Sequence, residues 1–174
     1  MTSAAHDKRL ILVRHSKAEQ NVALDDHDRQ LTERGRLDAQ AVGAWLKTES
    51  IVCDLVICST SVRTRQTWEE AVRGGAHTEF VEYRRGVYLG GTAGALDSIR
   101  DDAGDLDTVL VVGHAPAMPG IASILCDGEG SPQAHEAMAA GFPTSGIALL
   151  RYAGDWDGIG PGTAELERFH VARG

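Results

Sequence analysis

The chain has 174 residues, a formal net charge of −8 at pH 7 and a hydrophobic content of 43%. These values are typical of one soluble globular domain, which we expect to span residues 1–174. The acidic balance argues against nucleic acid and against an anionic membrane surface as partners, because both attract basic proteins. A local basic pocket stays compatible with it, because net charge describes no single site.

The sequence also bears on location and cofactors. Met1–Arg9 lacks an apolar run of signal-peptide length, and no segment approaches the ~20 apolar residues of a membrane span. We therefore expect a cytoplasmic protein. Cys53, Cys58 and Cys126 are odd in number and form no C-x-x-C pair, so neither a disulfide framework nor a zinc site is predicted.

The predicted elements alternate between strands and helices. In chain order they are a strand at Arg9–Val13, a helix from Thr32 to about Thr48, a strand at Asp54–Cys58, a helix at Ser61–Arg73, a strand at Thr78–Tyr83, a helix at Ala93–Asp102, a strand at Thr108–Val112, a helix at Pro116–Cys126, and strands at Gly146–Tyr152 and Glu165–Val171. Residues 127–145 are rich in Gly, Pro, Ala and Ser, which predicts a long loop with at most one turn of helix.

This order predicts an α/β fold with three layers, in which helices cover both faces of a mostly parallel central sheet. The last two strands are expected to be neighbours and antiparallel. Thr32 has a side chain suited to an N-cap for the first helix. The inner face of that helix is expected to consist of Leu37, Ala41, Ala44, Trp45 and Leu46.

Basic side chains follow three predicted strands at their carboxyl ends. Arg14 and His15 follow the first strand, Arg63 lies in the helix turn after the second, and His114 follows the strand Thr108–Val112. Because ligands of open α/β sheets bind at this edge, we expect the four side chains to meet. Each alone would more often be a surface or ion-pairing residue. Together, in an acidic protein, they predict a bound anion.

This quartet has the chemistry of phosphoryl transfer. Arginine forks match phosphate oxygens, and the positive end of the helix near Ser61 lies at the same edge. Neutral His15 would attack phosphorus in line and form a covalent intermediate. Arg14, Arg63 and a protonated His114 would neutralise charge without a metal. A carboxylic acid would protonate the leaving oxygen and then help to activate water.

Three motifs resemble those of the histidine phosphatase superfamily, which includes phosphoglycerate mutases and small phosphohistidine phosphatases. They are Leu12-Val13-Arg14-His15, Ser59-x-x-x-Arg63-x-x-x-Thr67 and Val111-Val112-Gly113-His114, in the family's order and spacing. The resemblance covers about residues 9–152. It implies a phosphoglycerate mutase-like fold and phosphatase activity through a phosphohistidine at His15, with no cofactor.

A fourth segment, Asp26-x-x-Arg29-x-Leu31-Thr32-x-x-Gly35, is similar to the D-x-x-R-P-L-T-x-x-G stretch of the small bacterial phosphohistidine phosphatases. The short chain agrees, because phosphoglycerate mutases usually carry long insertions. This branch implies that Arg29 binds substrate. It also implies that the partner is a phosphorylated small molecule or a phosphohistidine-bearing protein. The oligomeric state stays open.

Two positions depart from these patterns. Ser16 stands where the family has the glycine of its RHG signature, and Gln30 stands where the branch has proline. A hydroxyl group at position 16 could be merely tolerated or could add a hydrogen bond near the phosphate. Both departures leave the quartet intact, so they bear on specificity more than on catalysis.

The general acid has two candidates. Glu82 lies at the end of the third strand, where mutase-like members often place a glutamate, and Asp26 lies where the small branch offers an aspartate. We favour Asp26 slightly because the other branch features agree. A phosphohistidine substrate would need only a weak acid, since imidazole is a better leaving group than an alkoxide. Asn21 either contacts phosphate, as in mutase-type members, or caps a loop.

The leading hypothesis is a metal-independent phosphatase that acts through phospho-His15. The alternatives are a phosphoglycerate mutase-type phosphomutase, a metallohydrolase with His15, His114 and Asp26 as ligands, and a non-catalytic phosphate-binding module. The missing insertions argue against the mutase, and the lack of an H-E-x-x-H spacing argues against the metallohydrolase. The complete quartet argues against a module without catalytic activity. Specificity is expected in the loops Asp25–Gln30, Tyr83–Gly94 and Asp127–Thr144.

Overall fold

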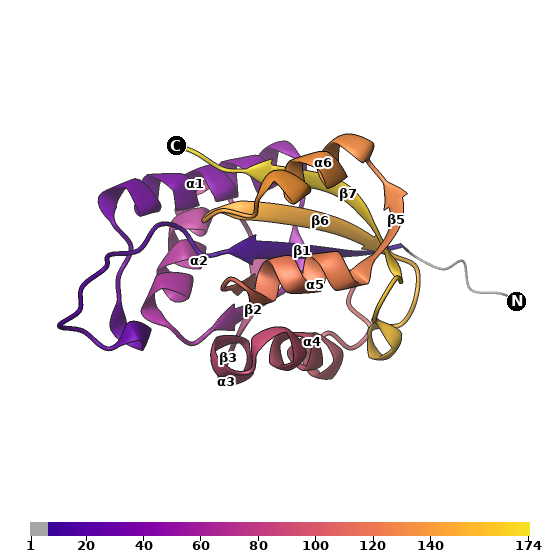
Figure 1. Cartoon of the computed structure of the whole chain (residues 1–174), viewed down its shortest axis with the longest axis horizontal. Helices are drawn as coiled ribbons and strands as arrows, with labels where there is room; N and C mark the ends of the chain where they lie inside the picture. The colour runs from indigo at the N-terminus through magenta and orange to yellow at the C-terminus, as the bar shows by residue number, and fades with distance from the viewer. Residues whose placement is uncertain (1–6) are drawn as a thin grey trace, which may run out of the picture.

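A sheet of seven strands runs through the middle of the protein (Figure 1). The computed structural model describes residues 7–174. The strands are β1 (Lys8–Arg14), β2 (Cys53–Ser59), β3 (Thr78–Arg84), β4 (Thr108–Gly113), β5 (Cys126–Gly130), β6 (Gly146–Tyr152) and β7 (Ala164–Val171). Their order is β3-β2-β4-β1-β6-β7-β5, and each pairing is parallel except those of β6 with β1 and β7. The prediction of a mostly parallel sheet with an antiparallel last pair is confirmed.

Helices cover both faces of this sheet, as predicted for a three-layer fold (Figure 1). They are α1 (Glu33–Thr48), α2 (Val62–Gly74), α3 (Arg85–Leu89), α4 (Gly91–Asp102), α5 (Ala117–Leu125) and α6 (Pro132–Ala140), with 3-10 turns η1 (Asp26–Asp28) and η2 (Trp156–Gly158). The pair α1 and α2 packs on one face, and α3 to α6 pack on the other. No helix among residues 7–174 is long and apolar enough to cross a membrane.

The central strand β1 shows why unbroken apolar runs form strands here. Leu10 and Leu12 belong to the core beneath α4 and α5, whereas Ile11 and Val13 belong to the core beneath α1 and α2. Alternate residues of a strand face opposite sides, so a strand covered on both faces needs apolar residues at every position. Because β1, β2 and β4 are parallel, their carboxyl ends share one edge of the sheet.

The first two helices begin and end where the sequence predicts. Thr32 Oγ1 accepts a hydrogen bond of 3.0 Å from Gly35 N, as an N-cap should. The helix α2 ends before Gly75, whose φ of 114° is a left-handed conformation that favours glycine.

The prediction of a long loop over residues 127–145 is wrong, because this segment contains most of β5 and all of α6. Ser131 accepts a hydrogen bond from Ala134 N at 3.2 Å, and Pro132 occupies the first turn of α6. The glycines of this segment lie just outside the helix, whereas the helix itself is rich in alanine. The composition averaged over residues 127–145 therefore hid the helix. The helix α3 likewise occupies part of the predicted loop Tyr83–Gly94.

The predicted inner face of α1 is also wrong in part. Leu37 is 44% exposed and Ala44 is exposed, whereas the buried residues are Gly35, Asp38, Ala39, Val42, Gly43 and Leu46. The reason is a close approach of the α1 and α2 backbones. A Cβ atom added to Gly43 would lie 1.8 Å from the carbonyl oxygen of Ala71. The buried face of α1 is therefore determined by where its backbone can approach that of α2, and not by the positions of its largest apolar side chains.

We predict that Gly43→Ala destabilises the protein by about 2 kcal/mol, because the helices must separate to admit the methyl group. The better helix propensity of alanine, worth about 1 kcal/mol, should not compensate. Urea unfolding measures this effect. Ala44→Gly, on the exposed face of the same helix, is the control and should cost only the propensity difference. A Gly43→Ala variant as stable as the wild type would contradict the close packing.

Candidate active site

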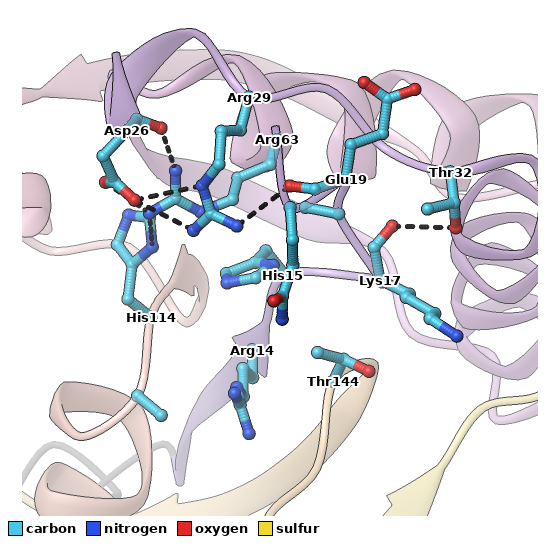
Figure 2. Close-up of a pocket in the computed structure, with 13 residues that line it drawn as sticks. Arg14, His15, Lys17, Glu19, Asp26, Arg29, Thr32, Arg63, His114 and Thr144 are labelled. Atoms are coloured by element: carbon cyan, nitrogen blue, oxygen red, sulfur yellow. Dashed lines mark hydrogen bonds and ion pairs between the residues drawn. The ribbon is translucent and has the colours of Figure 1, made fainter. Parts of the chain in front are cut away.

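The carboxyl ends of β1, β2 and β4 open into a cavity of about 620 Å³. Arg14, His15, Arg63 and His114 all line it, together with Asp26 from the loop between β1 and α1. Figure 2 shows His15 in the middle of this group, with Arg14 below it and His114 and Asp26 on one side. The structure thus brings the four residues of the sequence-predicted quartet around one cavity.

The side chain of His15 is held in one tautomer. Its Nδ1 atom lies 2.8 Å from the carbonyl oxygen of Ser16, which can only accept, so Nδ1 carries the proton. The Nε2 lone pair is then left for other chemistry. Burial lowers the pKa of His15 to about 4, with help from the charges of Arg63, Arg14 and Arg29 and against the hydrogen bond to Ser16. His15 is therefore neutral at pH 7.

His114 is fixed at both ring nitrogens. Arg63 Nη2 donates to Nδ1 at 3.2 Å, so Nε2 carries the proton and donates to Ser59 Oγ at 2.7 Å. Burial, together with the neighbouring His15 and Arg63, lowers the pKa of His114 to about 3, against the charge of Asp26. The expectation of a protonated His114 is thus wrong for the unliganded protein, because an arginine donor and a dry environment both favour the neutral ring.

Asp26 is bound by three donors from three parts of the chain. Its carboxylate accepts from Arg63 Nη2 at 3.0 Å, from Tyr88 Oη at 3.0 Å and from Arg29 Nη2 at 2.9 Å (Figure 2 draws the arginine contacts). Burial alone would raise the pKa of Asp26, but the hydrogen bonds from Tyr88, Arg29 and Arg63 hold it at about 2. The carboxyl group is therefore ionised near neutral pH and has no proton to donate.

The two arginines of the quartet have donors without partners. Arg14 Nη1 donates to the carbonyl oxygen of Phe142 at 3.0 Å, and Arg63 Nη1 donates to that of Asp26 at 2.6 Å. Both Nε atoms are buried and have no hydrogen-bond partner within residues 7–174. Leaving a buried donor unpaired costs about 1–3 kcal/mol. Such guanidinium groups beside a cavity match the oxygens of a bound oxyanion.

Comparison with known proteins bears on the chemistry of this cavity. The family model of the histidine phosphatase superfamily (branch 1) matches residues 10–91. A protein of Mycobacterium tuberculosis is 37% identical over 165 residues, which are 92% of this chain and all of the relative.

Two solved structures share the whole fold. A candidate phosphohistidine phosphatase SixA from Nakamurella multipartitia is 34% identical, with a TM-score of 0.83 over 98% of this chain and 99% of its own. A second candidate SixA, from Agrobacterium tumefaciens, is 28% identical, with a TM-score of 0.75 over 94% of this chain and 97% of its own. The chain belongs to the histidine phosphatase superfamily, in its SixA-like branch. It is accordingly a phosphatase of the histidine phosphatase type.

Three other residues expected in the site of this histidine phosphatase lie elsewhere. Glu82 is inside the edge strand β3, where it pairs with Arg84 at 3.2 Å, and it does not line the cavity. Glu82 is therefore not placed to act as the general acid, which corrects that expectation, because its side chain pairs with Arg84 outside the cavity. Asn21 Oδ1 accepts from Ala23 N at 3.0 Å and caps an exposed loop.

Ser16 is fully buried on the opposite side of the chain from His15. Its hydroxyl lies 2.6 Å from that of Ser145, and its backbone N donates to Thr67 Oγ1 at 3.0 Å. The side chain therefore fixes the segment behind the site and does not line the cavity.

Sequence reasoning missed Tyr88 and Lys17. Tyr88 lies on α3, a five-residue helix without a clear pattern, and reaches Asp26 across 62 positions of the chain. Its ring also packs edge-on against His114, with 5.6 Å between centroids. Lys17 lines the cavity two residues after His15.

Metal ligation finds no support in the geometry of the described part of the chain. Within residues 7–174, no three His, Cys, Asp or Glu side chains are grouped so that they could hold a metal ion. The alternative in which His15, His114 and Asp26 bind a metal therefore lacks a ligand set.

We predict that the imidazoles of His15 and His114 stay neutral as the pH is lowered from 7 to 5. Their pKa values of about 4 and about 3 place both titrations well below that of a free histidine. ¹⁵N NMR of the unliganded protein measures the two titrations directly. A midpoint near 6.5 for either ring would contradict the buried, arginine-flanked environment.

The same shift makes stability depend on pH. The folded pKa of His15 lies below its unfolded value of about 6.5. The unfolded state therefore binds more protons in this range, and stability falls as the pH drops from about 6.5 toward 4. Urea unfolding at several pH values should show this slope, and His15→Gln should flatten it. An unchanged slope in the variant would show that other groups cause the dependence.

Proposed function

We propose that this protein is a phosphohistidine phosphatase or small-phosphomonoester phosphatase that acts through a phosphohistidine at His15. The observation that carries the proposal is the exposed lone pair of His15 Nε2 in a cavity flanked by Arg14 and Arg63. A neutral imidazole is a competent nucleophile, and its low pKa keeps it neutral without help from a base.

In the first step, His15 Nε2 forms a bond to phosphorus while the bond from phosphorus to the leaving group breaks. Arg14 and Arg63 neutralise the charge on the phosphoryl oxygens, and His114 orients Arg63 through its Nδ1 atom. In the second step, water attacks phospho-His15, and phosphate leaves with restoration of the neutral ring. The positive charge that this chemistry needs comes from the arginines, and the proposed reaction uses no metal or cofactor.

The ionised state of Asp26 bears on the substrate. A carboxylate with a pKa of about 2 is a base and not an acid in the free protein. It suits the second step, where water must lose a proton. It gives little help to an alkoxide leaving group, which must gain one. This favours leaving groups that need no strong acid, and the imidazole of a phosphohistidine is such a group.

The relatives support the same substrate class. The Nakamurella and Agrobacterium structures are described as candidate phosphohistidine phosphatases, and each matches nearly the whole chain. In this proposal Arg29 positions Asp26. It donates to the Asp26 carboxylate from Nε at 3.1 Å and from Nη2 at 2.9 Å, and it lines the substrate cavity.

We predict that the protein takes up a covalent label from ³²P-acetyl phosphate or from a phosphohistidine peptide. The label should be stable to alkali and labile to acid, as expected for a phosphoimidazole. His15→Ala should abolish the label. His27→Ala is the matched control, because His27 contacts Thr60 and lies outside the cavity lining. Label that persists in His15→Ala would refute the proposal.

We also predict that Asp26→Asn slows the second step more than the first. Loss of the general base should lower kcat by about 10²-fold. The phosphorylated form should then accumulate, and rapid-quench measurements with p-nitrophenyl phosphate should show a burst of one nitrophenolate per protein. If the variant shows wild-type kcat and no burst, Asp26 is not the base.

A further inference from the structure

The cavity extends past His15 to a further cation, Lys17, which follows His15 by two residues in the segment after β1. His15 and Lys17 line the cavity, while Ser16 between them is fully buried behind it. Figure 2 shows the Lys17 ammonium on the other side of His15 from Asp26 and His114.

Lys17 differs from the other basic residues of the cavity in its surroundings. Arg29 and Arg63 are both paired with Asp26 within 3.0 Å. Lys17 and Arg14 are in no ion pair with an acidic group of residues 7–174 within 4.0 Å. Glu19 also lines the cavity, but Figure 2 shows its carboxylate directed away from the Lys17 ammonium. Two cations without carboxylate partners therefore flank the nucleophile.

The backbone of Lys17 is held in place by the start of α1. Its carbonyl oxygen accepts from Thr32 N at 2.9 Å and from Thr32 Oγ1 at 3.3 Å. Gly35 packs so closely that an added Cβ atom would lie 2.0 Å from the same oxygen. The side chain thus projects from a fixed point into the cavity, which is how a binding residue is pre-organised.

The cavity has room for more than a phosphoryl group. Its volume of about 620 Å³ lies within the ~300–1,000 Å³ of sites that enclose whole small ligands. A phosphoryl group bound by Arg14 and Arg63 occupies the side near Asp26, which leaves the side near Lys17 for another part of the substrate.

We propose that Lys17 forms a second anion subsite that selects phosphorylated substrates carrying a carboxylate beside the phosphoryl group. The inference rests on the proposed function, since it places the phosphoryl group at His15. The carboxylate comes either from a small phosphorylated acid or from an acidic side chain next to a phosphohistidine. The two sources share the same chemistry, and an ammonium pairs with either.

The test compares two aryl phosphates that differ in one carboxylate, phenyl phosphate and 3-carboxyphenyl phosphate. The wild type should prefer the carboxylated ester by about tenfold in kcat/KM, chiefly through KM, as expected for one charge-assisted hydrogen bond. Lys17→Met should reduce this preference to less than about twofold, and Lys17→Arg should retain most of it. A phosphohistidine peptide with aspartate or asparagine beside the phosphohistidine tests the peptide source in the same way.

Lys47→Met is the matched control. Lys47 is exposed on α1 and does not line the cavity, so this substitution removes the same charge at a distance from the site. It should leave both rates and their ratio unchanged. Two results would overturn the subsite. One is a wild type that prefers neither 3-carboxyphenyl phosphate over phenyl phosphate nor the aspartate peptide over the asparagine peptide. The other is a Lys17→Met variant that keeps the wild-type preference. A wild type that hydrolyses neither the two esters nor the phosphohistidine peptides would instead overturn the proposed phosphatase.

Discussion

The ion pair between Asp26 and Arg63 organises the chemistry of this protein. Three parallel strands bring two arginines and two neutral histidines to one edge of the sheet, and the like charges of the arginines repel each other. Asp26, from the loop between β1 and α1, meets Arg63 at 3.0 Å and Arg29 at 2.9 Å. This carboxylate compensates the charge in the unliganded protein and ties the loop to α2.

Burial and the neighbouring arginines set the protonation states of the site. Burial lowers the pKa values of His15 and His114, and the charge of Arg63 acts in the same direction, so both imidazoles are neutral. Hydrogen bonds from Tyr88, Arg29 and Arg63 hold Asp26 in its ionised form. A neutral nucleophile and an ionised base are what a two-step phosphoryl transfer to water requires. One arginine thus links substrate charge, nucleophile and base.

The sequence predicts the parts of the fold that follow from continuous patterns. Strands buried on both faces have apolar runs, such as Leu10 to Val13, and the N-cap of α1 is Thr32. The quartet could be placed because strand ends are predictable once the strands are. The face of α1 was mispredicted because it depends on a backbone approach at Gly43, and α6 was missed because flanking glycines dominated the composition.

The protonation of the site could not be predicted in this way. The state of Asp26 depends on Tyr88, which is brought to it by α3, and the state of His114 depends on Ser59 and Arg63 in three dimensions. The burial of Ser16 and the place of Lys17 in the cavity lining likewise come from the three-dimensional structure.

The central claim is that the Ser16 carbonyl holds the proton on His15 Nδ1 and leaves Nε2 as the nucleophile. The most direct measurement is ³¹P and ¹⁵N NMR of the trapped phosphoprotein, which distinguishes the two phosphohistidine isomers. The account predicts phosphorus bonded to Nε2 of His15. Phosphorus on Nδ1, or on another residue, would contradict it.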